Sequence, residues 1–154
     1  MTTPFIHRNL PRLLLQARES VMAHTRPGLR EHGLSDPQWR VLRVLGEHSL
    51  VETGRVAREA FILGPSLTGV LTRMERDGLI RRARDAADQR RTVVEPTAKG
   101  RRLVSKLSHS IEAHYAFMES SLGKSKLAQL YRLLDEVIAL ESPQPQPTEL
   151  ELPA

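Results

Sequence analysis

Apolar residues recur at three- and four-residue spacing along most of the chain, which predicts helices that each bury one face. The first helix is predicted over residues 5–31, and Pro27 followed by glycine predicts a kink or a helix end near its last turn. Two shorter helices are predicted over residues 35–46 and 53–61, the first of them opened by a serine N-cap with an early proline.

A further helix is predicted between the Gly-Pro pair at Pro65 and the glycine at Gly78. Its apolar side is a regular stripe, whereas its other side is small and hydroxyl-bearing at the start and basic at the end. That outer side consists of Pro65, Ser66, Thr68, Gly69, Thr72, Arg73 and Arg76. Small side chains allow close approach to another surface, and hydroxyls can bond to base edges. The pattern favours a DNA-recognition helix, although an ordinary amphipathic helix would show the same stripe.

The periodicity changes after this helix. Residues 79–84 and 91–95 are predicted to be short strands joined by a polar loop, which is typical of a β-hairpin or wing. Pro96 should end the second strand, and Thr97 should cap a long helix that runs to the glycine at 123. A last helix carries apolar residues at alternating three- and four-residue spacing, which predicts packing against another helix. The expected fold is mainly α with a small β wing.

Length and composition exclude several classes of protein. At 154 residues the chain suits one domain, and it shows neither a signal segment nor an apolar run of membrane-spanning length, so we expect a cytoplasmic protein without a membrane partner. The absence of cysteine excludes disulfides and thiolate metal sites. The six histidines form no i, i+4 pair, and no nucleophile elbow or phosphate loop is present. We therefore expect no metal, no cofactor and no enzymatic activity.

The positive charge is concentrated next to the predicted recognition helix. The chain has a net charge of +5, and residues 73–102 carry ten basic against five acidic side chains, which accounts for the whole excess. Most of the basic residues are arginine, which suits phosphate contacts and minor-groove insertion. The distribution predicts a nucleic-acid-binding surface, with a solubilising patch as the alternative.

The element order and two short motifs resemble the MarR family of winged helix-turn-helix regulators. The motifs are Asp88-x-Arg90 in the wing and Thr97-x-x-Gly100 after it. The chain is also similar to the subgroup of repressors that control homoprotocatechuate degradation. That similarity extends over six segments, at residues 13–22, 25–27, 38–45, 62–79, 88–91 and 133–140.

The resemblance implies a homodimer that binds a pseudo-palindromic operator in double-stranded DNA. Residues 1–34 and 98–141 would dimerise, residues 35–97 would form the winged helix-turn-helix domain, and the proline-rich residues 142–154 would be disordered. Arg90 would enter the minor groove and Asp88 would orient it, with a plain surface ion pair as the alternative. Regulation of another aromatic or stress pathway, or non-specific architectural DNA binding, remain as alternative functions.

The resemblance further implies release from DNA by a small aromatic carboxylate such as 3,4-dihydroxyphenylacetate or 4-hydroxyphenylacetate. Such an effector needs a cation and an apolar slot, which Arg18 and Trp39 could supply, with Arg12 and Arg40 as secondary candidates. Core packing is the alternative role for Trp39, and a structural ion pair with an acid is the alternative for Arg18.

Overall fold

The computed structural model describes residues 4–141, so the predicted disorder of residues 142–154 lies outside the described part. The chain forms two compact units, the first ending at His114 and the second beginning at Tyr115. Within residues 4–141, no helix is both long enough and apolar enough to span a bilayer.

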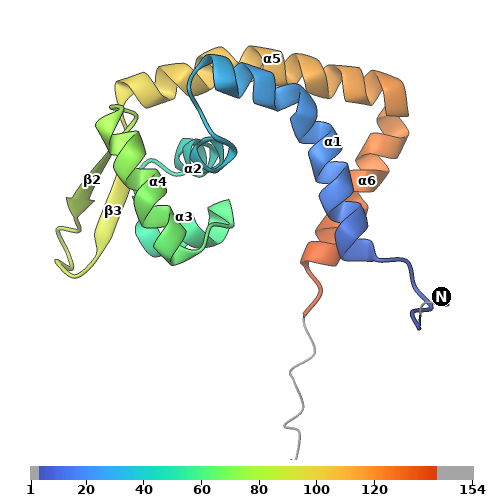
Figure 1. Ribbon diagram of the computed structural model, residues 1–154, viewed down its shortest axis with the longest axis horizontal. Coiled ribbons are helices and arrows are strands. Elements are labelled where there is room, and N and C mark those ends of the chain that lie inside the picture. Colours follow the sequence, from blue (N-terminus) through green and yellow to red (C-terminus); the bar gives the residue numbers. More distant parts are fainter. Residues whose placement is uncertain (1–3, 142–154) are drawn as a thin grey trace, which may run out of the picture. The chain divides into compact units, whose positions relative to one another are not determined.

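The described residues form six helices and a three-stranded antiparallel sheet (Figure 1). The predicted class, mainly α with a small β wing, is confirmed. The elements in chain order are α1 (Leu10–Glu31), α2 (Asp36–Glu47), β1 (Val51–Glu52), α3 (Thr53–Ala60), α4 (Gly64–Arg76), β2 (Ile80–Arg84), β3 (Thr92–Pro96), α5 (Ala98–Leu122) and α6 (Lys124–Ile138).

The first helix differs from its prediction at Pro27. A helix end at this proline is wrong, because α1 continues through Pro27 and ends at Glu31, before Gly33 adopts a left-handed conformation with φ of 68°. Figure 1 shows that α1 changes direction along its length, in agreement with the predicted kink. Proline lacks the N–H for a hydrogen bond to the preceding turn, so a helix can pass through it at the cost of one bond and a bend.

The second helix begins as the sequence predicts. Ser35 accepts a hydrogen bond from the backbone N–H of Gln38, and the Gln38 side chain accepts one from the backbone N–H of Ser35. This capping box satisfies two donors that the start of a helix leaves without intrahelical partners. The fixed start directs the apolar face of α2, including Val41 and Leu42, into the centre of the core.

The sheet places the wing against the helix-turn-helix. In sheet order β3 lies between β1 and β2, with Val51 opposite Val94 and Ile80 opposite Pro96. The strand β1 was not predicted, because two residues are too few to show an alternating pattern. Pro96 is the last residue of β3, as expected from its missing N–H.

The Thr97-x-x-Gly100 motif joins the start of α5 to the turn that follows α4. The Thr97 hydroxyl donates to the Gly78 carbonyl at 2.6 Å and accepts from the Gly100 N–H at 3.1 Å, while the Thr97 N–H donates to Leu79. Gly100 is buried, and a Cβ at this position would overlap the Leu79 carbonyl. The motif therefore allows two backbone segments to touch where any side chain would separate them.

Replacing Gly100 by alanine should lower the free energy of unfolding by about 2 kcal/mol or more, because a methyl group would push against backbone that cannot rotate away. Chemical denaturation followed by circular dichroism measures the change. Gly46→Ala, in the last turn of α2, is the matched control, since a Cβ there meets nothing within 4 Å. Equal stabilities of the two variants would contradict the close contact.

The second unit contains α6, whose apolar seam is largely exposed in the single chain. Leu127 is buried and Leu134 is half-buried, but Leu130 and Val137 of the seam, and Leu133 beside it, are each more than 40% exposed. In the first unit, α1 likewise exposes Leu10 and Leu15. Contiguous apolar side chains on a helix surface are typical of an interface with another protein surface.

Candidate functional site

Helix α4 divides into a core side and an outer side as the sequence predicts. Leu67, Val70, Leu71 and Met74 are buried, with Met74 fully enclosed. The outer side is exposed from Pro65 to Arg76, except that Gly69 is half-buried. Within residues 4–141 the hydroxyls of Ser66 and Thr68 make no hydrogen bond to the chain, so both are available to a partner.

Thr72 differs from the other hydroxyl residues of this face. Its hydroxyl donates to the Thr68 carbonyl at 2.8 Å and lies 3.4 Å from Arg82 Nη2 of the wing. Since its single hydrogen is used within the helix, Thr72 can offer a base edge only an acceptor while this bond holds. It stays a predicted DNA contact, with a narrower chemical role than Ser66 or Thr68.

Two hydrogen bonds that join α4 to β2 were not predicted from the sequence. Glu75 accepts from Arg82 twice, from Nη2 at 3.1 Å and from the backbone N–H at 3.0 Å. The side-chain hydrogen bond from Arg82, followed by the backbone bond, holds the pKa of Glu75 below its ordinary value. The two residues lie on different elements, so no periodic pattern relates them. Their contact joins α4 to the β2–β3 hairpin.

The wing loop presents Arg90 to solvent. Asp88 accepts from the Arg90 backbone N–H at 3.0 Å and from its Nε at 3.2 Å, while the Arg90 side chain is 91% exposed. These bonds lower the pKa of Asp88, the side-chain bond from Arg90 contributing most. The geometry contains both predicted features, the ion pair and the oriented guanidinium. An exposed pair of this kind adds little to stability, so its orientation of Arg90 is the more consequential property.

Several other arginines of residues 73–102, where the positive charge is concentrated, have acidic partners. Arg76 pairs with Asp77, Arg81 with Glu95, and Arg91 with Glu52. These pairs are exposed, so each contributes little net energy to the fold. Arg73, in contrast, lies on the outer side of α4 with its guanidinium beside Gly69.

Gly69→Ala should affect stability and DNA binding in opposite directions. A Cβ at Gly69 would meet only the Arg73 guanidinium, at 3.5 Å, so alanine fits and should stabilise the helix by about 0.5–1 kcal/mol. If α4 lies in a groove, the same methyl group should weaken operator binding by roughly tenfold, which corresponds to about 1.4 kcal/mol. Thermal unfolding and a DNA titration measure the two effects. Unchanged DNA affinity would place this face away from the DNA.

A hollow of about 260 Å³ lies between α1 and α2. Three of the four predicted effector-binding residues, Arg18, Trp39 and Arg40, line it. Arg12 does not; its backbone N–H caps α1 through Asn9, and its side chain lies near the N-terminal segment. Trp39 is only 7% exposed, so it serves the core and offers only an edge to the hollow.

The hollow also contains a residue that the sequence analysis missed. Arg43 lines the hollow with its guanidinium carbon 6.0 Å from the centre of the Trp39 ring, within range of a cation–π contact. Arg43 forms no ion pair with any of residues 4–141. Its position four residues after Trp39, on the same helix face, is a signal that could have identified it.

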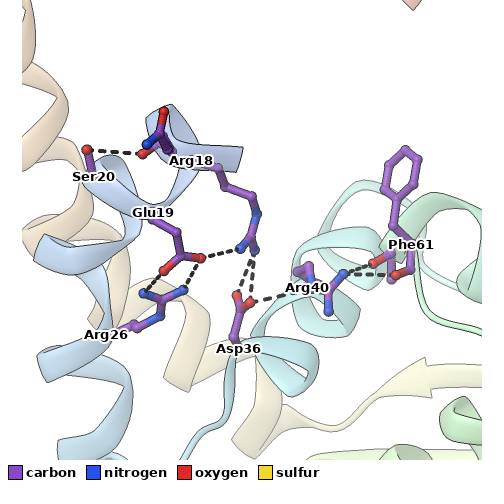
Figure 2. A network of polar contacts seen from close by, with 9 residues as sticks. Arg18, Glu19, Ser20, Arg26, Asp36, Arg40 and Phe61 are labelled. Atoms are coloured by element: carbon purple, nitrogen blue, oxygen red, sulfur yellow. Dashed lines mark hydrogen bonds and ion pairs between the residues drawn. The ribbon is translucent and has the colours of Figure 1, made fainter. Parts of the chain in front are cut away.

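Figure 2 shows an ion-pair network at the edge of this hollow. Arg18 Nη2 donates to both Asp36 oxygens, at 3.1 and 2.9 Å, so the structural pair predicted as an alternative does form. Arg40 Nη1 donates to the carbonyls of Ala60 and Phe61 at 2.8 and 3.0 Å. Phe61 is left-handed, with φ of 52°, a conformation that costs a non-glycine residue about 1–3 kcal/mol.

Near this network the structure gathers a group with metal-ligand chemistry. Ligand atoms of Glu47, His48 and Glu59 lie within 4.8 Å of one another, an acid–histidine arrangement that the search for histidine pairs missed. The same group is contacted by Arg55, which donates to Glu59 at 2.6 Å and lies 3.1 Å from His48 Nε2. The hydrogen bond from Arg55 is the main cause of the lowered pKa of Glu59. The guanidinium supplies the positive charge that balances these acids.

Known proteins resemble the chain over nearly its whole length. The chain is 42% identical to the homoprotocatechuate degradative operon repressor of Escherichia coli over 135 residues, which cover 88% of this chain and 91% of the relative. It is 37% identical to the HTH-type transcriptional regulator FarR of Neisseria gonorrhoeae, covering 92% and 97% of the two chains.

A solved structure and a family model agree with these similarities. The crystal structure of NadR in complex with 4-hydroxyphenylacetate matches with a TM-score of 0.82 and 38% identity, over 92% of this chain and all of that chain. Residues 32–91, from the end of α1 to the wing loop, match the model of the MarR family. The winged helix-turn-helix geometry and the identity over most of the chain lead to one conclusion: this protein belongs to the MarR family of winged helix-turn-helix regulators.

Proposed function

We propose that this protein is a ligand-responsive transcriptional repressor that binds operator DNA as a homodimer and controls an operon for aromatic catabolism. The observation that carries the proposal is the outer side of α4, where the exposed hydroxyls of Ser66 and Thr68 make no hydrogen bond to residues 4–141 and Gly69 leaves room for a close approach. Identity of 42% to a homoprotocatechuate degradative operon repressor supports the regulated pathway. We further propose a cytoplasmic location and no catalytic activity.

Dimerisation follows from the exposed apolar side chains of α1 and α6. Residues 1–34 and 98–141 form the dimer interface in this proposal, and residues 35–97 form the DNA-binding domain. A two-fold dimer places its two recognition helices in successive major grooves, about 34 Å apart, so the operator is a pseudo-palindrome. The tail at residues 142–154 has no assigned role.

Each residue of the proposed DNA surface has a chemical role. Ser66, Thr68 and Thr72 contact base edges, and Pro65 and Gly69 allow the helix to approach them closely. Arg73 and Arg76 contact phosphates or a guanine, whereas Arg90 enters the minor groove from a position set by Asp88. A hollow between α3, α4 and the sheet, lined by Thr53, Thr68 and Arg82 among others, lies along the same surface.

The proposed effector is a small aromatic carboxylate of the 4-hydroxyphenylacetate class, the compound present in the similar NadR structure. In the hollow beside Trp39, Arg43 has no acidic partner among residues 4–141, and Arg18 is bound to Asp36. An incoming carboxylate therefore pairs with Arg43 and competes with Asp36 for Arg18. Trp39 supplies the apolar contact. Arg12 remains a candidate only in an arrangement that brings another part of the dimer to this hollow.

A gel-shift titration tests the proposal, with DNA from upstream of the protein's own gene and a scrambled duplex of the same length and composition. We expect roughly a thousandfold preference or more for the specific duplex, and its loss on addition of 4-hydroxyphenylacetate or 3,4-dihydroxyphenylacetate. Equal binding to the two duplexes would instead support a non-specific architectural protein. Specific binding whose affinity is unchanged by either acid would indicate a regulator of another pathway.

A further inference from the structure

The guanidinium of Arg40 holds the corner between the two helices of the helix-turn-helix. Its Nη1 donates to the carbonyls of Ala60 and Phe61, the last groups of α3 before the turn into α4. The carbonyls at the end of a helix have no intrahelical donors, and an arginine side chain can supply them. Since Phe61 is left-handed and its side chain is 85% exposed, packing of that side chain does not hold the turn.

The Nε of the same guanidinium faces the carboxylate of Asp36, which is already hydrogen-bonded to Arg18. Arg40 Nε is buried without a hydrogen-bond partner among the described residues, and its nearest acid oxygen is Asp36 Oδ2 at 4.0 Å. Asp36 instead accepts both of its short bonds from Arg18, at 3.1 and 2.9 Å. A buried N–H without an acceptor is unfavourable. A shift of about 1 Å would bring the Asp36 carboxylate to Arg40 Nε, so that Arg40 gains the acceptor that Arg18 loses.

Figure 2 shows the three side chains in a row, with Asp36 between Arg18 on α1 and Arg40 on α2. All three line the hollow proposed for the effector. We propose that Arg40 is the positioning residue that transmits effector binding to the recognition helix, with Asp36 as a carboxylate exchanged between Arg18 and Arg40. This inference rests on the proposed function.

The exchange follows from charge. An effector carboxylate bound to Arg18 takes over the donors that Asp36 uses and repels Asp36, because both groups are negative. Asp36 then moves to Arg40 Nε, which is ready to donate. The guanidinium is rigid and planar, so a pull on Nε reorients Nη1 and with it the two bonds to the α3–α4 corner. The start of α4 shifts, and the spacing of the two recognition helices in the dimer changes.

Arg40→Lys tests the inference, because lysine keeps the charge but cannot bond Asp36 and two carbonyls through one planar group. Three quantities are measured on the full-length dimer: the Kd for the operator duplex, the Kd for 4-hydroxyphenylacetate, and the factor by which saturating acid raises the operator Kd. We expect that factor to be about tenfold or more in the wild type and below about twofold in the variant. The factor is a ratio of two operator Kd values, so a change in the operator Kd alone leaves it unaltered, and the two separate Kd values are measured beside it. Arg30→Lys, at an exposed position on α1, is the matched control and should keep the wild-type factor.

Asp36→Asn gives a second, independent measurement if Arg40→Lys lowers the melting temperature. It removes the exchanged charge and preserves the shape of the side chain, so it should abolish the same factor. The double variant should then behave as either single variant does. A wild-type factor in both variants, or a proportional loss of both affinities, would overturn this inference and leave the proposed function intact. A wild type that binds its operator but ignores the acid would overturn the effector proposal itself.

Discussion

Arg90→Ala is expected to weaken operator binding by roughly ten- to a hundredfold and to lower its dependence on salt concentration. The side chain is 91% exposed at the wing tip, so its removal leaves the fold unchanged. Each phosphate charge neutralised contributes about 0.9 to the slope of log affinity against log salt, and the dimer carries two wings, so the slope should fall by about two. Fluorescence anisotropy at several salt concentrations measures both quantities.

Asp88→Asn tests whether Asp88 affects DNA binding by orienting Arg90 or only through its own negative charge. Removing a negative charge near DNA should tighten binding if Asp88 acts only through its charge. If Asp88 orients Arg90 through the bonds at Nε and the backbone N–H, its replacement should weaken binding instead. Arg30→Ala, at an exposed site on α1, is the control and should leave the slope unchanged. An unchanged slope in Arg90→Ala would remove Arg90 from the DNA contact.

Arg18→Ala is expected to weaken binding of 4-hydroxyphenylacetate by about ten- to a hundredfold, since a hydrogen bond to a charged group contributes about 1.5–3 kcal/mol. The guanidinium lies at the edge of the hollow, 40% exposed, and is held there by Asp36. Isothermal titration calorimetry on the free dimer gives the Kd directly. The effector Kd of Arg18→Lys should lie between those of the wild type and of Arg18→Ala, because lysine keeps the positive charge but lacks the planar guanidinium.

Arg30→Ala is the matched control on the same helix, because its side chain is exposed and does not line this hollow. It should leave the effector Kd within about twofold. A different result for Arg18→Ala, a lower melting temperature with an unchanged effector Kd, would reduce Arg18 to a structural partner of Asp36. The effector carboxylate would then depend on Arg43 alone.

The elements that the sequence predicted well are those determined by neighbours along the chain. The capping box at Ser35 and Gln38 forms between residues three apart, and the buried stripe of α4 repeats within one helix. The wing strands end where Pro96 removes a donor. At Pro27 the local signal was ambiguous, because proline weakens a helix without always ending it. Of the two outcomes predicted there, a kink or a helix end, the helix end does not occur and the helix bends instead.

The candidate site was likewise predictable only where its residues are near neighbours in the sequence. The exposed residues of α4 follow from periodicity, and Asp88 bonds Arg90 two residues away. The partners that cross between elements were missed. Glu75 with Arg82, Arg43 with the hollow, and the acid–histidine group around His48 depend on which side chains the fold brings together.

The amino-acid pattern by itself determined the helices, the wing, the outer side of α4 and the family, because periodicity, caps and turns act between near neighbours. Only the tertiary structure decided that Arg40 holds the Phe61 carbonyl, that Asp36 lies between two arginines, and that Gly100 touches Leu79. These contacts join residues far apart in the chain. Their geometry depends on how the helices pack, which no local spacing encodes.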